Sequence, residues 1–131
     1  QQALKILKDL TKINRRSGQL IEREDFLTDF GRHTANLLAA KAFTDQALHS
    51  LDVSASRGNI VQSEHDNIRM AAIHTTETSR SVVRFAFDYS GMHGITNESN
   101  LNRIFRDIHV ASQHLLVNSS QYKVMIKRMI G

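Results

Sequence analysis

Residues 90–114 read SGMHGITNESNLNRIFRDIHVASQH and combine a glycine-containing turn with an amphipathic helix. Gly91 and Gly94 suit a tight turn because glycine adopts backbone conformations that other residues disfavour. After the turn, apolar residues recur three or four positions apart, which is the period of a helix that buries one face. They are Leu101, Ile104, Phe105, Ile108, Ala111 and Leu115. The pattern predicts one helix over residues 98–117.

Three more helical stretches lie upstream, over about residues 2–14, 24–53 and 60–90. Arg15-Arg16-Ser17-Gly18 ends the first, because basic residues and glycine favour a helix C-terminus. Small residues fill the middle of the third, from Ala71 to Ser79, so a neighbouring helix can come close to it. We therefore expect this third helix to be central. A tail helix is expected to end at Gly131, after a bend near residues 118–121.

Composition supports an all-α fold in a single domain that spans residues 1–131. The chain has 131 residues, six glycines and no proline, whereas an all-β fold needs many tight turns. Two of the expected helices have about thirty residues and would each be about 45 Å long. Short loops between long helices favour antiparallel neighbours, so we predict an up-down-up-down four-helix bundle.

Composition also excludes several classes of protein and site. The absence of cysteine excludes disulfides and thiol catalysis, and a cytoplasmic location is expected. No apolar run approaches the length needed to cross a membrane, and no signal peptide opens the chain. The net charge of +4 is concentrated at the two ends, so no nucleic-acid partner is expected. Because the chain opens on Gln1-Gln2, we expect it to be a piece of a longer protein.

The seven histidines do not show the spacing of a metal site. A di-iron bundle needs Glu-x-x-His pairs, and neither that pattern nor His-x-x-x-His occurs in the sequence. A serine-nucleophile elbow and a phosphate loop are also absent. What remains is Arg106-Asp107, one to two turns before the polar pair Gln113-His114. Read on their own, these residues also suit an intrahelical charge pair and a solvent-facing histidine.

The spacing of the glycine turn and Arg106-Asp107 resembles the C-terminal domain of the acyl-CoA dehydrogenase superfamily. In that superfamily a Gly-Gly-x-Gly turn ends the penultimate helix, and Arg-Asp follows fifteen residues after the first glycine. Gly91 and Arg106 are separated by that interval, and Gly94 matches a further glycine, although Met92 replaces another. The turn at residues 14–19 is similar to the family's Arg-x-x-Phe-Gly turn without its phenylalanine.

One position separates the chemistries of this superfamily. Many of its dehydrogenases carry a catalytic glutamate nine residues after that arginine, where this chain has Leu115. One residue earlier stands His114, and this pattern resembles the flavin monooxygenase branch. That branch includes the oxygenase components of two-component phenol and 4-hydroxyphenylacetate hydroxylases, and dibenzothiophene monooxygenase. In those enzymes a histidine at this point faces the flavin. An imidazole there can hydrogen-bond an oxygen atom or accept a phenolic proton.

The resemblance implies the C-terminal domain of a flavin-dependent monooxygenase that uses reduced flavin, FMN or FAD, and dioxygen on a small aromatic substrate. It implies that an N-terminal helical domain and a central β-domain precede this chain. His114 would be catalytic, Arg15 or Arg16 would contact the flavin phosphate, and backbone at Gly91 and Gly94 would approach the cofactor. A separate flavin reductase is a further implied partner.

A homo-oligomer, dimer or tetramer, is also implied. We expect the six phenylalanines to supply apolar surface for it: Phe26, Phe30, Phe43, Phe85, Phe87 and Phe105.

Two other functions remain open at this point. An acyl-CoA dehydrogenase with its base elsewhere would fit the domain, although Leu115 cannot remove a proton. A helical oligomerisation module without catalysis would also fit, and the upstream sequence would distinguish it.

The helical period also predicts side-chain directions near His114. We expect His114 to face away from the bundle core and Leu115 to pack beside Ile108 and Ala111. We expect His109 to lie outside the His114 site, and Asp107 to pair with Arg103 or Arg106.

Overall fold

The computed structural model describes residues 1–10, 20–91 and 99–131, and all regular elements in these ranges are helical. The α-helices are α1 (Gln2–Leu10), α2 (Glu24–Ser56), α3 (Gln62–Tyr89), α5 (Asn100–Ala111) and α6 (Tyr122–Ile130). Three 3-10 turns complete the set, namely η1 (Leu20–Glu22), η2 (Leu115–Val117) and η3 (Ser119–Gln121). The predicted all-α class is therefore confirmed.

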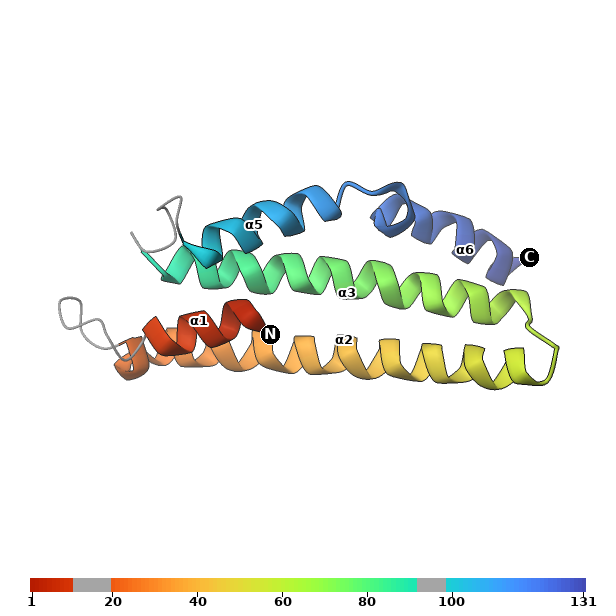
Figure 1. The fold of residues 1–131 in the computed structure, drawn as a ribbon, viewed down its shortest axis with the longest axis horizontal. Coiled ribbons are helices and arrows are strands. Elements are labelled where there is room, and N and C mark those ends of the chain that lie inside the picture. The colour runs from red at the N-terminus through yellow and green to blue at the C-terminus, as the bar shows by residue number, and fades with distance from the viewer. Residues whose placement is uncertain (11–19, 92–98) are drawn as a thin grey trace.

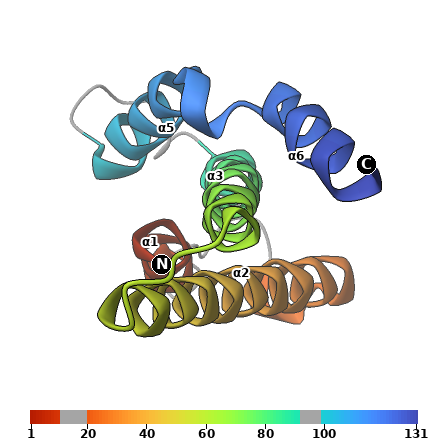
Figure 2. The same ribbon diagram turned by 90° about the vertical axis from the view of Figure 1, so that its right-hand side faces the viewer.

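The helices run alternately up and down along one long axis. Figure 1 shows α2 and α3 as the two long helices, antiparallel to each other, with α1 beside one end of the pair. The fourth member of the bundle is divided, because α5 and α6 follow one another along α3. In Figure 2, α3 lies between α1 and α2 on one side and α5 and α6 on the other. The third helix is central, as its small residues predicted.

Small side chains bring α2 and α3 together over their middle. Ala40 of α2 and Ala71 of α3 are fully buried. Close by, the Thr44 hydroxyl donates to the Ala40 carbonyl and lies 2.8 Å from the Thr75 hydroxyl of α3. Polar atoms buried between helices are tolerated when they hydrogen-bond one another, so this pair fixes the register of the two helices.

Aromatic side chains of α2 and α3 pack against one another inside the bundle, where Phe26 and Phe85 are buried and Tyr89 is half-buried. Phe26 of α2 stacks on Phe85 of α3 at 5.9 Å, and the Tyr89 ring lies 5.0 Å from each of them. None of the six phenylalanines is classed as exposed. Phe26 and Phe85 are buried, so they offer no surface for self-association, whereas the other four are half-buried and their part in it stays a prediction. Among the described residues, the exposed large apolar ones are Leu27, Leu38, Leu48, Ile60, Val61, Val110, Leu115, Leu116, Ile126, Met129 and Ile130.

The helix predicted over residues 98–117 ends earlier than expected, at Ala111. The Ser112 hydroxyl donates to the His109 carbonyl at 2.8 Å, and the Ser112 N–H bonds back to Ile108. His114 then takes an extended conformation, with φ −63° and ψ 131°. The Ser112 N–H still makes an α-helical bond, but the Gln113 and His114 N–H groups bond only three residues back, to the Val110 and Ala111 carbonyls, so the helix tightens and stops before the extended His114. The chain thus breaks first at His114, and the bend predicted near residues 118–121 follows at Asn118, which is also extended and precedes η3 and the tail helix.

Candidate functional site

His114 lies just beyond α5, at the start of the 3-10 turn η2. Its Nδ1 accepts a hydrogen bond from the Leu116 backbone N–H at 3.3 Å, so the ring acts as the N-cap of that turn. The His114 side chain is exposed and faces away from the core. The imidazole is therefore held by the chain on one side and open to solvent on the other.

Leu115 does not pack where the helical period predicted. It is 69% exposed, and Leu116 is 53% exposed. The expectation assumed that residues 108–115 belong to one helix, and α5 has already ended at Ala111. Val110, on the last turn of α5, is 76% exposed, so exposed aliphatic residues flank His114 in the sequence on both sides.

His109 is engaged in packing between α5 and α3, apart from the His114 turn. Its ring lies 4.3 Å from the Phe105 ring, which in turn lies 4.4 Å from Phe87 of α3. The Nδ1 atom lies 2.7 Å from the Phe105 carbonyl oxygen. A carbonyl oxygen only accepts, so Nδ1 of His109 carries the proton.

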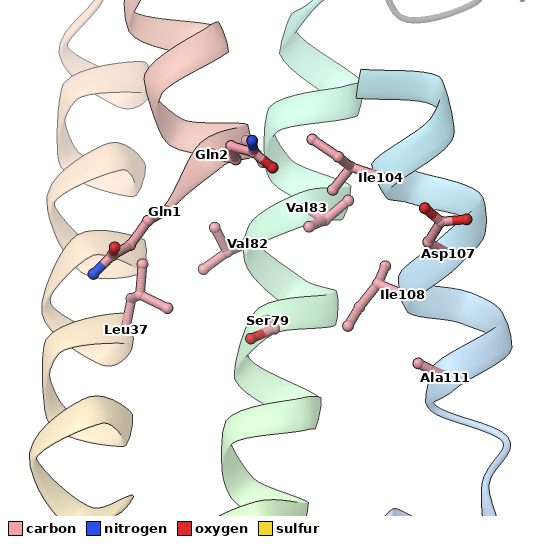
Figure 3. A pocket seen from close by; sticks show the side chains of 11 residues that line it. Gln1, Gln2, Leu37, Ser79, Val82, Val83, Ile104, Asp107, Ile108 and Ala111 are labelled. Atoms are coloured by element: carbon pink, nitrogen blue, oxygen red, sulfur yellow. The ribbon is translucent and has the colours of Figure 1, made fainter. Parts of the chain in front are cut away.

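The Arg106-Asp107 pair is exposed, and Asp107 does not pair as expected. No ion pair joins it to Arg103 or Arg106 in the part of the chain that the structure describes. Asp107 instead borders a hollow of about 340 Å³ between α1, α2, α3 and α5. In Figure 3, Ile104 and Ile108 project from α5 into this hollow, toward α3. Its walls are largely aliphatic, so it provides few polar partners for a ligand.

Gly91 follows α3 and has a left-handed backbone, with φ +56°. A Cβ atom there would meet no atom within 4 Å, so a side chain would not clash with its neighbours. Glycine is favoured at this position because of its left-handed backbone conformation. Gly91 precedes α5 and His114 follows it. The twelve residues of α5 rise about 18 Å, so the helix separates the two residues. A ligand that touched both residues would have to extend along α5. Arg15, Arg16 and Gly94 lie outside the described residues.

Comparison with known proteins identifies the domain. Residues 2–119 match the family described as acyl-CoA dehydrogenase, C-terminal domain. This chain belongs to that family. It is also similar to indole-3-acetate monooxygenase from Pseudomonas putida, at 30% identity over 105 residues. That alignment covers 79% of this chain and 27% of the relative, so the chain spans about a quarter of the relative's length.

Membership of the acyl-CoA dehydrogenase C-terminal domain family confirms the resemblance drawn from the Gly91–Arg106 interval. The matched residues run from α1 through η2 and include His114. Within the described ranges, no group of three or more histidines and carboxylates could hold a metal ion. Nor is any described helix of this family domain long and apolar enough to cross a membrane.

His33 of α2 is a half-buried polar residue that the sequence reasoning missed. Its Nδ1 is buried, and the described residues offer it no hydrogen-bond partner. The ring stacks on Phe85 at 4.5 Å. Burial lowers the pKa of His33, opposed by Asp29 and assisted by Arg32. The spacing 26, 30, 33, 37 places His33 on the apolar stripe of its helix, and that signal could have found it.

Proposed function

We propose that this chain is the C-terminal helical part of a flavin-dependent monooxygenase that acts on a small aromatic substrate. The observation that carries the proposal is the exposed His114 at the end of α5, eight residues after Arg106. The relative named indole-3-acetate monooxygenase supports it, since the alignment covers most of this chain. Indole-3-acetate is itself a small aromatic acid, which favours a substrate of that class.

The surface near His114 fits a flavin. A flat ring system needs apolar contacts and a few polar partners, and His114 is flanked in sequence by the exposed Val110, Leu115 and Leu116. The flavin, when bound in reduced form, would supply the oxidising chemistry with dioxygen. The protein's part is to bind the ring, exclude water with these aliphatic side chains and offer one imidazole nitrogen.

Further cofactor contacts belong to the same proposal. Arg15 or Arg16 would bind the flavin phosphate, because a guanidinium forks onto phosphate oxygens. The Gly91–Gly94 turn would let backbone approach the cofactor. Because α5 separates Gly91 from His114, these contacts would involve different parts of one extended cofactor, or cofactors of two subunits.

The assembly that we propose is a homo-oligomer, dimer or tetramer, supplied with reduced flavin by a separate reductase. Exposed apolar residues on α2 and α6, among them Leu38, Leu48, Met129 and Ile130, are the surface available for subunit contacts. An equilibrium sedimentation measurement on the full-length protein tests this assembly, and a monomer at all concentrations would contradict it.

The decisive test of the reaction class compares two substrates in the full-length protein. With reduced FMN or FAD and dioxygen, indole-3-acetate or a simple phenol should yield an oxygenated product. A CoA thioester with oxidised flavin should not be desaturated, because Leu115 stands where dehydrogenases carry a carboxylate. Desaturation of the thioester without oxygenation of either aromatic compound would overturn the proposal.

A further inference from the structure

Two consecutive 3-10 turns follow α5, and each is capped by the side chain that precedes it. His114 accepts from the Leu116 N–H through Nδ1 at 3.3 Å, and Asn118 accepts from the Ser120 N–H through Oδ1 at 2.9 Å. The two capping residues share an extended backbone, with φ/ψ of −63°/131° and −78°/135°. His114 therefore occupies an N-cap position, for which asparagine, aspartate, serine and threonine are the preferred residues.

This hydrogen bond determines which nitrogen of His114 carries the proton. A backbone N–H can only donate, so Nδ1 must present its lone pair to Leu116. In the neutral ring the proton is then on Nε2, which lies on the far side of the ring from the cap. His109 has the opposite arrangement, because its Nδ1 donates to the Phe105 carbonyl. The chain thus fixes opposite tautomers five residues apart.

We propose that the cap makes His114 a hydrogen-bond donor, with Nε2–H directed at the bound flavin or substrate. This inference rests on the proposed function, because the proposed function places the ligand beside His114. The tautomer of the ring follows only from the hydrogen bond between the Leu116 N–H and His114 Nδ1. While the cap is formed, Nε2 has no lone pair, so it does not accept a proton from a substrate hydroxyl. The Leu116 N–H is the positioning group, since it holds the ring and its tautomer without touching a ligand.

Three substitutions of His114 distinguish its role as a capping acceptor from its role as a hydrogen-bond donor. His114→Asn keeps an acceptor at the position of Nδ1, as Asn118 shows, but is too short to reach as far as Nε2. His114→Gln carries an N–H donor with longer reach and loses the short capping acceptor. His114→Ala lacks both groups. Since the residue is exposed, none of the three opens a cavity in the core.

The first readout is independent of any cofactor. Nitrogen-15 NMR of the imidazoles should show His114 protonated on Nε2 and His109 protonated on Nδ1. Hydrogen exchange at the Leu116 amide should be similar in the parent and in His114→Asn. It should be about twofold to thirtyfold faster in His114→Gln and His114→Ala, the range expected for loss of an N-cap. A proton on Nδ1 of His114, or unchanged exchange in His114→Ala, would overturn the inference.

The second readout is the product formed per dioxygen consumed by the full-length enzyme. A donor role predicts that His114→Gln retains more product than His114→Ala, while His114→Asn resembles His114→Ala. Equal loss in the Gln and Ala variants would contradict the donor role. If NMR gives the expected tautomer and exchange rates but no variant changes the product formed per dioxygen, the proposed function is contradicted and the capping hydrogen bond is confirmed. If the product yield falls in His114→Ala but NMR does not give the expected tautomer and exchange rates, the capping inference is contradicted and the proposed function is still supported.

Discussion

Arg128 of α6 places its guanidinium 2.6 Å from the carboxylate of Asp66, in the second turn of α3. The Asp66 side chain is only 7% exposed, and Gln62 donates to the same carboxylate oxygen at 3.2 Å. The two charged residues are 62 positions apart in the sequence. This contact anchors the last helix of the chain to the start of the central one.

Removal of Arg128 should destabilise the protein through the carboxylate that it leaves behind. Arg128→Ala is expected to lower the free energy of unfolding by about 1.5–3 kcal/mol, because hydrogen bonds to buried charges contribute that much. Urea denaturation followed by circular dichroism measures it. The loss should shrink in an Asp66→Asn background, where no buried charge is left unpaired.

The matched control for this prediction is Arg84→Ala. Arg84 and Asp88 also form an ion pair, at 3.7 Å, but their side chains are 74% and 60% exposed. Such a pair contributes about 0.5 kcal/mol or less. Equal effects of the two arginine substitutions would show that burial of Asp66 does not matter.

His33 should make stability depend on pH. Its pKa in the folded protein is lowered below the ordinary value of 6.5, first by burial. The unfolded chain therefore binds a proton more readily, and stability declines as pH falls from 6.5 toward the lowered folded pKa. Above 6.5 the ring is neutral in both states and this penalty is absent.

Substitution of the ring isolates this contribution. Between about pH 7.5 and about pH 5.5, the free energy of unfolding should fall less in His33→Phe than in the parent. His49→Phe, at an exposed position of the same helix, should leave the parent's pH dependence intact. A parent-like dependence in His33→Phe would contradict this account.

Gly31 and Gly91 should respond in opposite directions to the same substitution. An added Cβ meets no atom within 4 Å at either position, but Gly91 has φ +56° whereas Gly31 lies inside α2. Gly91→Ala should destabilise the protein by about 1–2 kcal/mol, the cost of a left-handed L-residue. Gly31→Ala should stabilise it by about 0.5–1 kcal/mol, because glycine is a poor helix residue. Thermal or urea unfolding measures both, and stabilisation by Gly91→Ala would contradict the turn geometry.

The fold was largely predictable because apolar spacing reports helices directly. Residues 24–53 and 60–90 were expected as helices, and α2 and α3 cover Glu24–Ser56 and Gln62–Tyr89. The end of α5 was not predictable from that spacing, since Leu115 continues the apolar period beyond Ala111. The helix ends where the Gln113 and His114 N–H groups bond three residues back and the His114 backbone becomes extended, and neither residue type predicts that change by itself.

The candidate site was predictable only in part, and mainly through family resemblance. The interval from Gly91 to Arg106 led to His114, but the direction of Leu115 was wrong because it assumed a continuous helix. The ion pair of Asp66 with Arg128 depends on which helices meet in the bundle. Periodicity within one helix does not contain that information, so long-range polar partners were missed.

The central claim is that His114 serves an oxygenating flavin site, and the coupling of product to dioxygen tests it most directly. In the full-length enzyme, His114→Ala should still bind reduced flavin, while product per dioxygen falls roughly tenfold or more. The hydrogen peroxide released should rise correspondingly, because the oxygen consumed is not transferred. His49→Ala, at an exposed histidine on α2, should keep the parent's product yield. A product yield in His114→Ala equal to that of the parent would contradict the account.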